Sequence, residues 1–302
     1  MRPPVGPRVA EAMSSEVAPS PQGGSSDVLD DVTVVVPVRN AEAFIKDCLP
    51  AIIASRPAAL IVVDGLSTDR TVELAQQADA EVLSDQGRGV AAARLMGAER
   101  ARTPWVALID VDVVLHEGAL RALRDEAISG GYTALQAGLE STSGPGYWGR
   151  ALVNHHRSGI SRNWFGLVAT MFRREALLEH GLDRSFVSGE DIELRWRMEQ
   201  AGQRIGVSQR TIVEHRFGDT FQFALGQFLA DGGGLARMAV KHGLRATPLL
   251  GLPTAAAARG IAISLLRREP RWIPYYVTFV AMNWYGMARH LIREARRGTK
   301  RG

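Results

Sequence analysis

The stretch VALIDVDVVLHEGAL, residues 106–120, sets two carboxylates one residue apart directly after an apolar run. Together with Trp105, the run has the length and composition of a buried β-strand. Alternation along extended backbone places Asp110 and Asp112 on the same side. Because burying an unpaired charge is costly, we expect the pair at the edge of the core. At this edge the two aspartates could cap a helix, lie in solvent or bind a cation. For a cation, two carboxylate ligands suit Mg²⁺ or Mn²⁺.

The sequence before this strand alternates between strand and helix patterns. The predicted elements are strands within 31–40, 58–71, 80–85 and 105–110, and helices at 41–55, 70–78 and 90–101. Their short connections predict an α/β fold, Rossmann-like, with a mostly parallel sheet flanked by helices. Ligands bind beyond the carboxyl ends of the strands in such sheets. We therefore expect four segments to line one rim: 37–40, 64–69, 85–88 and 110–112.

The chain after this strand continues the pattern. The predicted elements are a helix at 117–129, a strand at 132–140, a strand end and helix at 166–181, an amphipathic helix at 188–202 and two short strands at 203–215. The amphipathic helix begins with Glu190 and Asp191, which we expect to face the rim. Acids in the first turn of a helix are also favoured by its dipole, so a purely structural role stays open for both.

Five segments together resemble the motifs of inverting family-2 glycosyltransferases in order and spacing, across roughly residues 32–220. They are VTVVVPVRN, LIVVDGLSTDRT, DQGRGVAAARLMGAERA, WVALIDVDVVL and GEDIELRWRMEQAG. The resemblance implies a GT-A fold and a nucleotide-diphospho-sugar donor, with UDP-sugars the commonest. It also implies Mg²⁺ or Mn²⁺ between the paired aspartates and the diphosphate, and direct displacement at the anomeric carbon.

The resemblance assigns most of the rim to the nucleotide sugar. The residues it implies there are Pro37, Arg39, Asn40, Asp64, Asp85, Arg88, Arg94 and Asp110. Many family members carry two adjacent acids where this chain has Asp64 followed by glycine, which weakens the expected contact with the base. Arg88 equally suits a solvated loop.

The resemblance also implies the reactive groups. Asp112 matches the stronger metal ligand, with Asp110 and His215 as further candidates, although a histidine after a strand is often a hydrogen-bonded structural residue. Asp191 matches the general base that takes the proton of the acceptor hydroxyl, while the cation holds the leaving diphosphate. Glu190 and Trp164 are expected on the acceptor side, where a tryptophan either stacks on a sugar or packs in the core.

The C-terminal quarter differs from the rest in charge. Residues 241–302 hold twelve Lys or Arg and two Glu, a balance of +10, so the other 240 residues carry 4 − 10 = −6. Two apolar stretches, 247–268 and the aromatic-rich 272–292, are flanked by arginines. They predict helices held on an anionic membrane surface, or a helical pair packed on the catalytic domain. No nucleic-acid motif accompanies the charge.

These observations predict a tail at 1–29, disordered by its composition, a catalytic domain at 30–220 and a basic helical region at 221–302. The predicted protein is a hexosyltransferase at the cytoplasmic face of the cell membrane, in the synthesis of a lipid-linked or cell-surface polysaccharide. The QxxRW sequence of processive synthases is absent, which favours single transfers. A nucleotidyltransferase of similar fold is disfavoured by the missing Gly-rich basic loop after the first strand. A non-catalytic nucleotide-sugar-binding protein is a further alternative.

Overall fold

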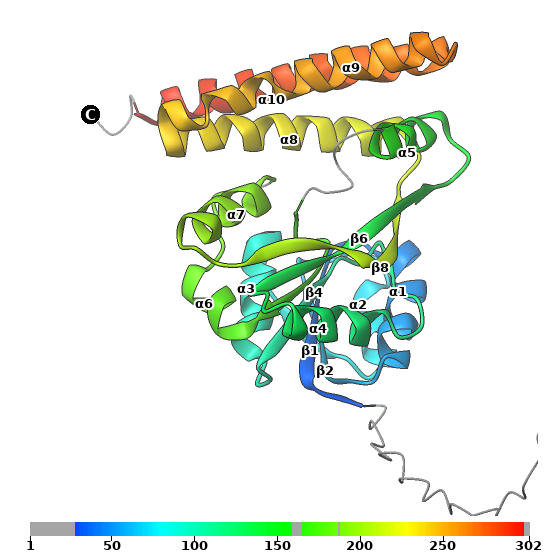
Figure 1. Ribbon diagram of the computed structural model, residues 1–302, viewed down its shortest axis with the longest axis vertical. Coiled ribbons are helices and arrows are strands. Elements are labelled where there is room, and N and C mark those ends of the chain that lie inside the picture. Colours follow the sequence, from blue (N-terminus) through cyan, green and yellow to red (C-terminus); the bar gives the residue numbers. More distant parts are fainter. Residues whose placement is uncertain (1–27, 159–164, 187, 299–302) are drawn as a thin grey trace, which may run out of the picture.

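The computed structural model describes residues 28–158, 165–186 and 188–298. Figure 1 shows a twisted sheet with helices on both faces and three long helices stacked above it. The strands are β1 Leu29–Val38, β2 Pro57–Asp64, β3 Glu81–Ser84, β4 Trp105–Ile109, β5 Val113–Val114, β6 Ala134–Ser143, β7 Ala169–Arg173 and β8 Ile205–Phe217. The helices are α1 Glu42–Ala54, α2 Thr71–Gln77, α3 Val90–Arg100, α4 Ala119–Ser129, α5 Tyr147–Ser158, α6 Arg174–His180, α7 Glu190–Gln200, α8 Phe221–His242, α9 Leu252–Leu266 and α10 Ile273–Gly298.

The first half of the sheet is parallel, as predicted. β3, β2, β1 and β4 lie side by side in that order, all pointing the same way. Both faces of the sheet are covered along the central parts of β1, β2 and β4, which are mainly apolar. On β1, Val34 packs in the core beneath α1 and α4, and its neighbour Val35 packs in the opposite core against α3. The four carboxyl ends therefore meet at one rim.

The second half of the sheet is mixed. β7 runs antiparallel between β4 and β6, and β8 runs parallel to β6. The two short strands expected at 203–215 are a single strand, β8, whose pairing with β6 shifts register between Gln136 and Gly138. Because the pairing changes register at this point, β8 stays one continuous strand, although its sequence predicts two strands. At its end, β8 pairs with the two-residue strand β5, so that His215 lies opposite Val113.

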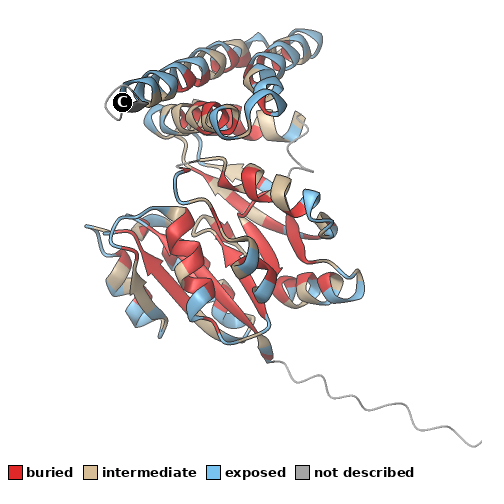
Figure 2. Ribbon diagram, turned by 90° about the vertical axis from the view of Figure 1, so that its left-hand side faces the viewer, coloured by how far each residue is buried: buried red, intermediate tan, exposed pale blue. Residues whose placement is uncertain are grey.

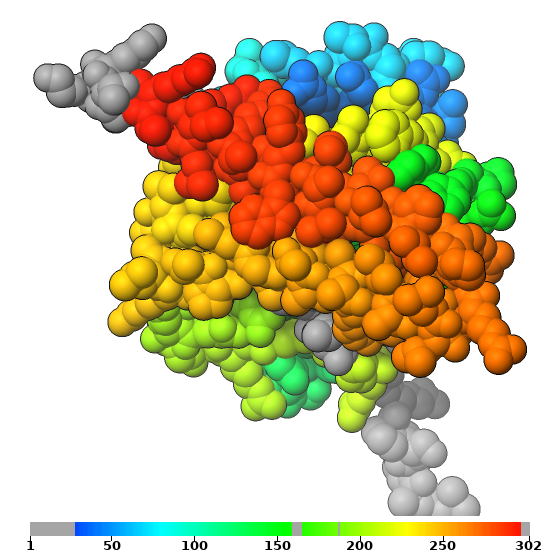
Figure 3. Space-filling model, turned by 90° about the horizontal axis from the view of Figure 1, so that it is seen from above, coloured from blue at the N-terminus to red at the C-terminus, as the bar shows by residue number. Residues whose placement is uncertain are grey.

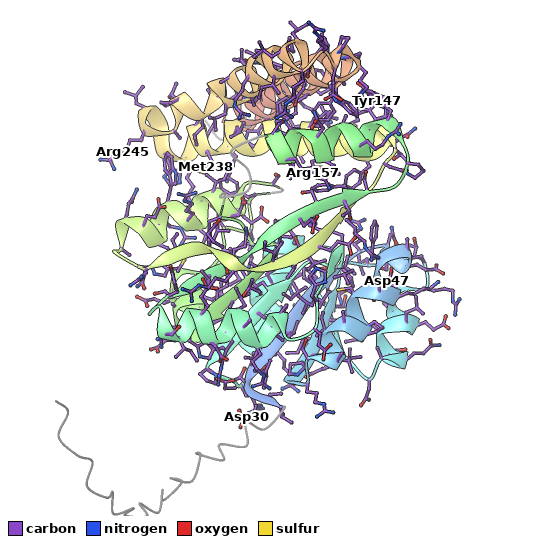
Figure 4. All side chains as sticks on the ribbon, turned by 45° about the vertical axis from the view of Figure 1, so that its right-hand side comes forward. Asp30, Asp47, Tyr147, Arg157, Met238 and Arg245 are labelled. Carbon is purple, nitrogen blue, oxygen red and sulfur yellow. The ribbon has the colours of Figure 1, made fainter. Side chains whose placement is uncertain are left out.

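The third layer consists of α8, α9 and α10, with α5 beneath one end (Figure 1). Aromatic side chains join it to α5, and three of them, Phe228, Tyr275 and Tyr276, are nearly inaccessible to solvent. On the other side, Met238 of α8 packs with Ile192 and Trp196 of α7, under the layer in Figure 4. The C-terminal helices thus pack on the catalytic part of the chain.

The outer surface of this layer is formed by α9 and α10, as the view from above shows (Figure 3). It carries exposed apolar side chains, Leu266 at 84% and Tyr285 at 58%, and exposed residues predominate there in Figure 2. Within the described ranges, one helical segment, Thr247–Leu266, is long and apolar enough to cross a membrane, with 22% of it buried. This is weak support for membrane association, because core helices meet the same criterion.

Not all of the basic residues of the C-terminal region face outward. Lys241 pairs with Asp183 and Glu193, both at 2.7 Å.

Candidate active site

A buried arginine organises the carboxylates beyond β4. Arg94 donates from Nη2 to Asp110 Oδ1 and from Nη1 to Glu190 Oε1, both at 2.6 Å, and is 4% exposed. Its helix, α3, lies close to the sheet, since a Cβ at Gly97 would be 2.2 Å from Val35 Cγ1. Burial opposes the charge of Arg94, but Asp110 and Glu190 outweigh it, so the pKa of the guanidinium is raised.

The structure shows what Arg94 and Glu190 contact. Arg94 holds both carboxylates, and Glu190, which is absent from the cavity wall described below, contacts Arg94. The contacts of Arg94 with the nucleotide and of Glu190 with the acceptor stay predictions. Burial and the nearby Asp112 raise the pKa of Asp110 despite Arg94. Asp110, Glu190 and Asp112 thus offer three carboxylates to one arginine, which favours a cation beside them.

Asp112 and His215 form a pair next to this cluster. The β5–β8 pairing brings them together, with Asp112 Oδ2 3.4 Å from His215 Nε2 and the Asp112 carbonyl accepting from the Arg216 amide at 2.9 Å. Asp112 Oδ1 and His215 Nδ1 are buried without a hydrogen-bond partner in the described part of the chain. Such groups are rare in native structures and point to a ligand.

The pair fits a divalent cation. A carboxylate oxygen and an imidazole nitrogen are both ordinary ligands of Mn²⁺, and the carboxylate also suits Mg²⁺. Across residues 28–158, 165–186 and 188–298, no group of three or more His, Cys, Asp or Glu is placed to hold a metal unaided. A cation here therefore needs further oxygen ligands from a bound substrate, as Mg²⁺ usually does.

Asp191 lies at the start of α7, facing a cavity. The helix begins after Gly189, whose φ of +86° favours glycine. The pKa of the Asp191 carboxyl is raised to about 7, first by burial and then by the charge of Glu190. Gln136 and Gly166 support it: Gln136 Oε1 accepts from the Gly166 amide at 2.7 Å, and a Cβ at Gly166 would be 3.2 Å from Asp191 Oδ2. A half-buried carboxylate of this pKa is suited to accept a proton.

The cavity has a volume of about 740 Å³ and lies between the sheet and the helical layer. Its floor includes Gln136, Glu140, Gly166, Asp191 and His215, and its roof includes Gln227, Asp231, Leu235, Leu252, Phe279 and Asn283. Arg157 of α5 stands at its edge, on the side toward the sheet in Figure 4. The roof comes from α8, α9 and α10, so the site extends beyond the expected end of the catalytic domain.

The rim of the parallel half holds the other predicted residues in its loops. The Asp64 carboxylate accepts from the amides of Leu66 and Ser67 at 3.1 and 3.2 Å. Asp85 accepts from the amides of Gly87 and Gly89 at 2.7 and 2.9 Å, and Arg88 Nε donates to its carbonyl at 2.8 Å. These acids therefore shape their own loops.

The first loop joins the second through side chains. Asn40 Oδ1 accepts from the Thr68 amide at 2.8 Å, and the Asn40 amide donates to Ser67 Oγ at 2.8 Å. Pro37 is buried in β1 beside Val63, while Arg39 is exposed at the rim. The structure thus brings five of the predicted nucleotide-binding residues to neighbouring loops: Arg39, Asn40, Asp64, Asp85 and Arg88. Pro37 lies within β1, and Arg94 and Asp110 belong to the cluster beyond β4.

Trp164, the tryptophan predicted on the acceptor side, lies outside the described residues. Trp148 packs against Phe221, with ring centroids 4.8 Å apart, and belongs to the core beneath α10. The sequence analysis missed Gln136, Gly166, Gln227 and Asp231. For Asp231 a signal existed, because it directly precedes the Gly232–Gly234 triplet.

Comparison with known sequences connects this geometry to a family. The profile of Glycosyl transferase family 2 matches residues 33–183. An uncharacterized glycosyltransferase of Mycobacterium tuberculosis is 35% identical over 190 residues, 58% of this chain and 82% of the relative. The pre-mycofactocin glycosyltransferase of the same species is 27% identical over 277 residues, and the chain spans only 56% of its length while 80% of the chain is covered. The succinoglycan biosynthesis protein ExoA of Rhizobium meliloti is 25% identical over 292 residues, 87% of each protein.

Solved structures agree on the fold. The mannosyltransferase PcManGT from Pyrobaculum calidifontis, in complex with GDP-Man and Mn²⁺, superposes with a TM-score of 0.62 at 18% identity, over 86% of this chain and 87% of that one. S. aureus TarS in complex with UDP-GlcNAc gives 0.55 at 15% identity, over 89% and 92%. At such identities the likeness establishes architecture alone. It confirms the predicted GT-A fold, including helices after the catalytic core.

Proposed function

The chain belongs to glycosyl transferase family 2, and we propose that it transfers a hexose from a nucleotide-diphospho-sugar to an acceptor hydroxyl with inversion. The observation that carries the proposal is Asp191, a carboxylate with a pKa of about 7 in the wall of the cavity. At neutral pH it is partly ionised and ready to accept a proton. The family match favours this reaction over nucleotidyl transfer.

Inversion follows from the use of one base in a single displacement. Asp191 takes the proton of the acceptor hydroxyl as its oxygen attacks the anomeric carbon from the face opposite the leaving diphosphate. Gly166, held by Gln136, leaves room beside the Asp191 carboxylate, because a Cβ there would be 3.2 Å from Asp191 Oδ2. Arg94 fixes Glu190 one residue before it, so the start of α7 is anchored to the sheet.

The donor side of the proposed site lies at Asp112 and His215. A divalent cation bound there, Mg²⁺ or Mn²⁺, would neutralise the charge of the leaving diphosphate. Two observations support it: the unpartnered atoms of both residues, and the Mn²⁺ present with GDP-Man in PcManGT. The rim loops around Asn40, Asp64 and Asp85 would hold the nucleoside. We propose a UDP-sugar as the donor, as in the UDP-GlcNAc complex of TarS.

The proposed acceptor is a saccharide, free or lipid-linked, in polysaccharide synthesis, as the name of ExoA suggests for that relative. We propose that the protein works at the inner face of the cell membrane, with the exposed apolar side chains of α9 and α10 against an anionic surface. The absence of the QxxRW sequence supports one transfer per encounter.

A panel of nucleotide sugars tests the proposal. Purified protein would be incubated with UDP-, GDP- and TDP-hexoses, with Mn²⁺, Mg²⁺ or EDTA, and then with saccharide acceptors. We expect metal-dependent transfer from one nucleotide class, and a product whose anomeric configuration, read by NMR, is inverted. A retained configuration would contradict the single displacement. Release of pyrophosphate in place of a nucleoside diphosphate would identify a nucleotidyltransferase.

A further inference from the structure

Three consecutive glycines, Gly232–Gly234, lie in the middle of α8. Glycine is unfavourable inside a helix, so the triplet calls for a physical reason. A Cβ at Gly232 would be 2.1 Å from the Asn283 carbonyl oxygen of α10, and one at Gly234 would be 2.3 Å from the Ser188 carbonyl oxygen. The glycines therefore let α8 approach α10 and the segment before α7 at backbone contact.

This approach places Asp231 at the active-site cavity. Asp231 directly precedes the triplet, and its Oδ1 accepts from Ser188 Oγ at 2.9 Å, three residues before Asp191. In the described part of the chain this is the one hydrogen bond to the carboxylate, and no cation pairs with it. Burial raises its pKa to about 6, and its charge contributes to the raised pKa of Asp191. The two acids thus stand near each other, on opposite sides of the cavity.

The surroundings of Asp231 complete a polar strip on the roof. Gln227 lies one turn earlier on the same face of α8, and its Oε1 is buried without a partner in the described residues. Leu235, one turn later, and Phe279 of α10 provide apolar surface next to the strip. A carboxylate and an amide beside apolar surface suit a saccharide, which has hydroxyl groups as well as apolar C–H faces.

We propose that Asp231 binds a second hydroxyl of the acceptor and so determines which hydroxyl reaches Asp191; this inference rests on the proposed function. The acceptor is then a polyhydroxylated molecule and not a simple alcohol. A carboxylate repels a diphosphate, so Asp231 does not bind that part of the donor; an unchanged donor KM in the variant described below would exclude the donor sugar as well. A simple alcohol would leave Asp231 with the Ser188 hydroxyl as its donor and no second one from the acceptor, and sites built for a hydroxyl discriminate strongly against ligands that lack it.

The test compares Asp231→Asn with wild type on p-nitrophenyl glycosides, their single-deoxy analogues and 1-octanol. Asparagine keeps the size and an acceptor for Ser188. We expect KM for the glycoside to rise about ten- to a hundredfold, with donor KM unchanged. With wild type, one deoxy analogue should show the same rise in KM that the full glycoside shows with Asp231→Asn. With Asp231→Asn, this analogue should show no further rise in KM. Wild type should use glycosides and not 1-octanol.

Ser188→Ala is the matched control for a structural role. It removes the hydrogen bond to Asp231 but leaves the carboxylate in place, so we expect acceptor KM to change much less than in Asp231→Asn. The inference would be overturned if acceptor KM rose equally in both variants, or if wild type used 1-octanol efficiently. Neither result would contradict the proposed glycosyl transfer. If wild type neither hydrolyses nor transfers any donor, the proposed function fails first, and this inference with it.

Discussion

The two halves of the candidate site use their carboxylates differently. At the parallel rim, Asp64 and Asp85 accept hydrogen bonds from the amides of their own loops. Near the mixed half, Asp112 has a buried oxygen with no partner among the described residues, and Asp191 and Asp231, which line the cavity, have raised pKa values. Since an unsatisfied buried polar group costs free energy, the second set is maintained for ligands and protons, and the first for loop shape. Substitutions should separate the two sets.

Removal of the metal or of its ligand should have the largest effect. We expect Asp112→Asn, or EDTA with wild type, to lower turnover about a thousandfold or more, since metal stabilisation amounts to several kcal/mol. Added Mn²⁺ should restore the EDTA-treated wild type and not the variant. The control is Asp30→Asn, an exposed aspartate at the far end of the molecule in Figure 4. Wild-type turnover in EDTA would remove the cation from the account.

Substitution of Arg94 tests whether its guanidinium stabilises the carboxylate cluster. Arg94→Met leaves Asp110 and Glu190 buried without their partner, and we expect a loss of about 3–5 kcal/mol in the free energy of unfolding. Arg100, on the same helix, pairs with Glu81 at the surface, so Arg100→Met should cost about 0–1 kcal/mol. Urea unfolding of both variants gives the comparison, and equal losses would show that burial is not the cause.

Asp191→Asn tests the base. We expect turnover to fall by about two or more orders of magnitude, the usual contribution of a positioned base, with donor affinity nearly unchanged. Glu199→Gln, on an exposed acid of the same helix, is the control and should retain wild-type turnover. Steady-state kinetics with equilibrium binding of the nucleotide separates the two quantities. Weaker donor binding with turnover preserved at saturation would make Asp191 a binding residue.

The pKa of Asp191 also predicts a pH dependence. Because the base must be ionised, kcat/KM should rise with pH through about 7. Stability has the opposite sign: a raised folded-state pKa stabilises the fold at low pH, and this stabilisation is lost between the unfolded value of 3.8 and about 7. Asp191→Asn should therefore be more stable than wild type at pH 8, by about 1 kcal/mol or more, and not at pH 4. A constant difference in Tm across this range would refute the shift.

The smallest effect is expected at the parallel rim. Asp85→Asn keeps one acceptor for the loop amides and loses the charge, so we expect a cost of about 1 kcal/mol in stability. Turnover at saturating donor should stay close to wild type. A loss of turnover as large as that of Asp191→Asn would mean that the two halves of the site are not distinct.

The parallel half of the fold and its rim could be predicted because they depend on local patterns. Continuous apolar runs such as Trp105–Ile109 identify strands buried on both faces, and the polar residues after them mark the rim. The paired aspartates and the helix start at Glu190 were recognisable by spacing, and family resemblance added His215.

The mixed half could not be predicted in the same way. The contact of His215 with Asp112 depends on a two-residue strand, β5, pairing with the end of β8, and nothing in Val113–Val114 alone specifies that partner. The ion pairs of Arg94 could not be predicted either, because its partners Asp110 and Glu190 lie 16 and 96 positions away in the sequence. The approach of α8 to the segment before α7 is a tertiary contact, so the role of Asp231 becomes visible only in three dimensions.

The central claim is that Asp112 serves donor binding and Asp191 serves proton transfer. It is tested most directly by measuring Mn²⁺-dependent binding of UDP-sugar by calorimetry, together with turnover, in Asp112→Asn and Asp191→Asn. The account predicts opposite effects on donor binding. Asp112→Asn should lose metal-dependent donor binding, and Asp191→Asn should keep it while losing transfer. Parallel losses of donor binding in both variants would contradict separate donor and proton-transfer sites in this cavity.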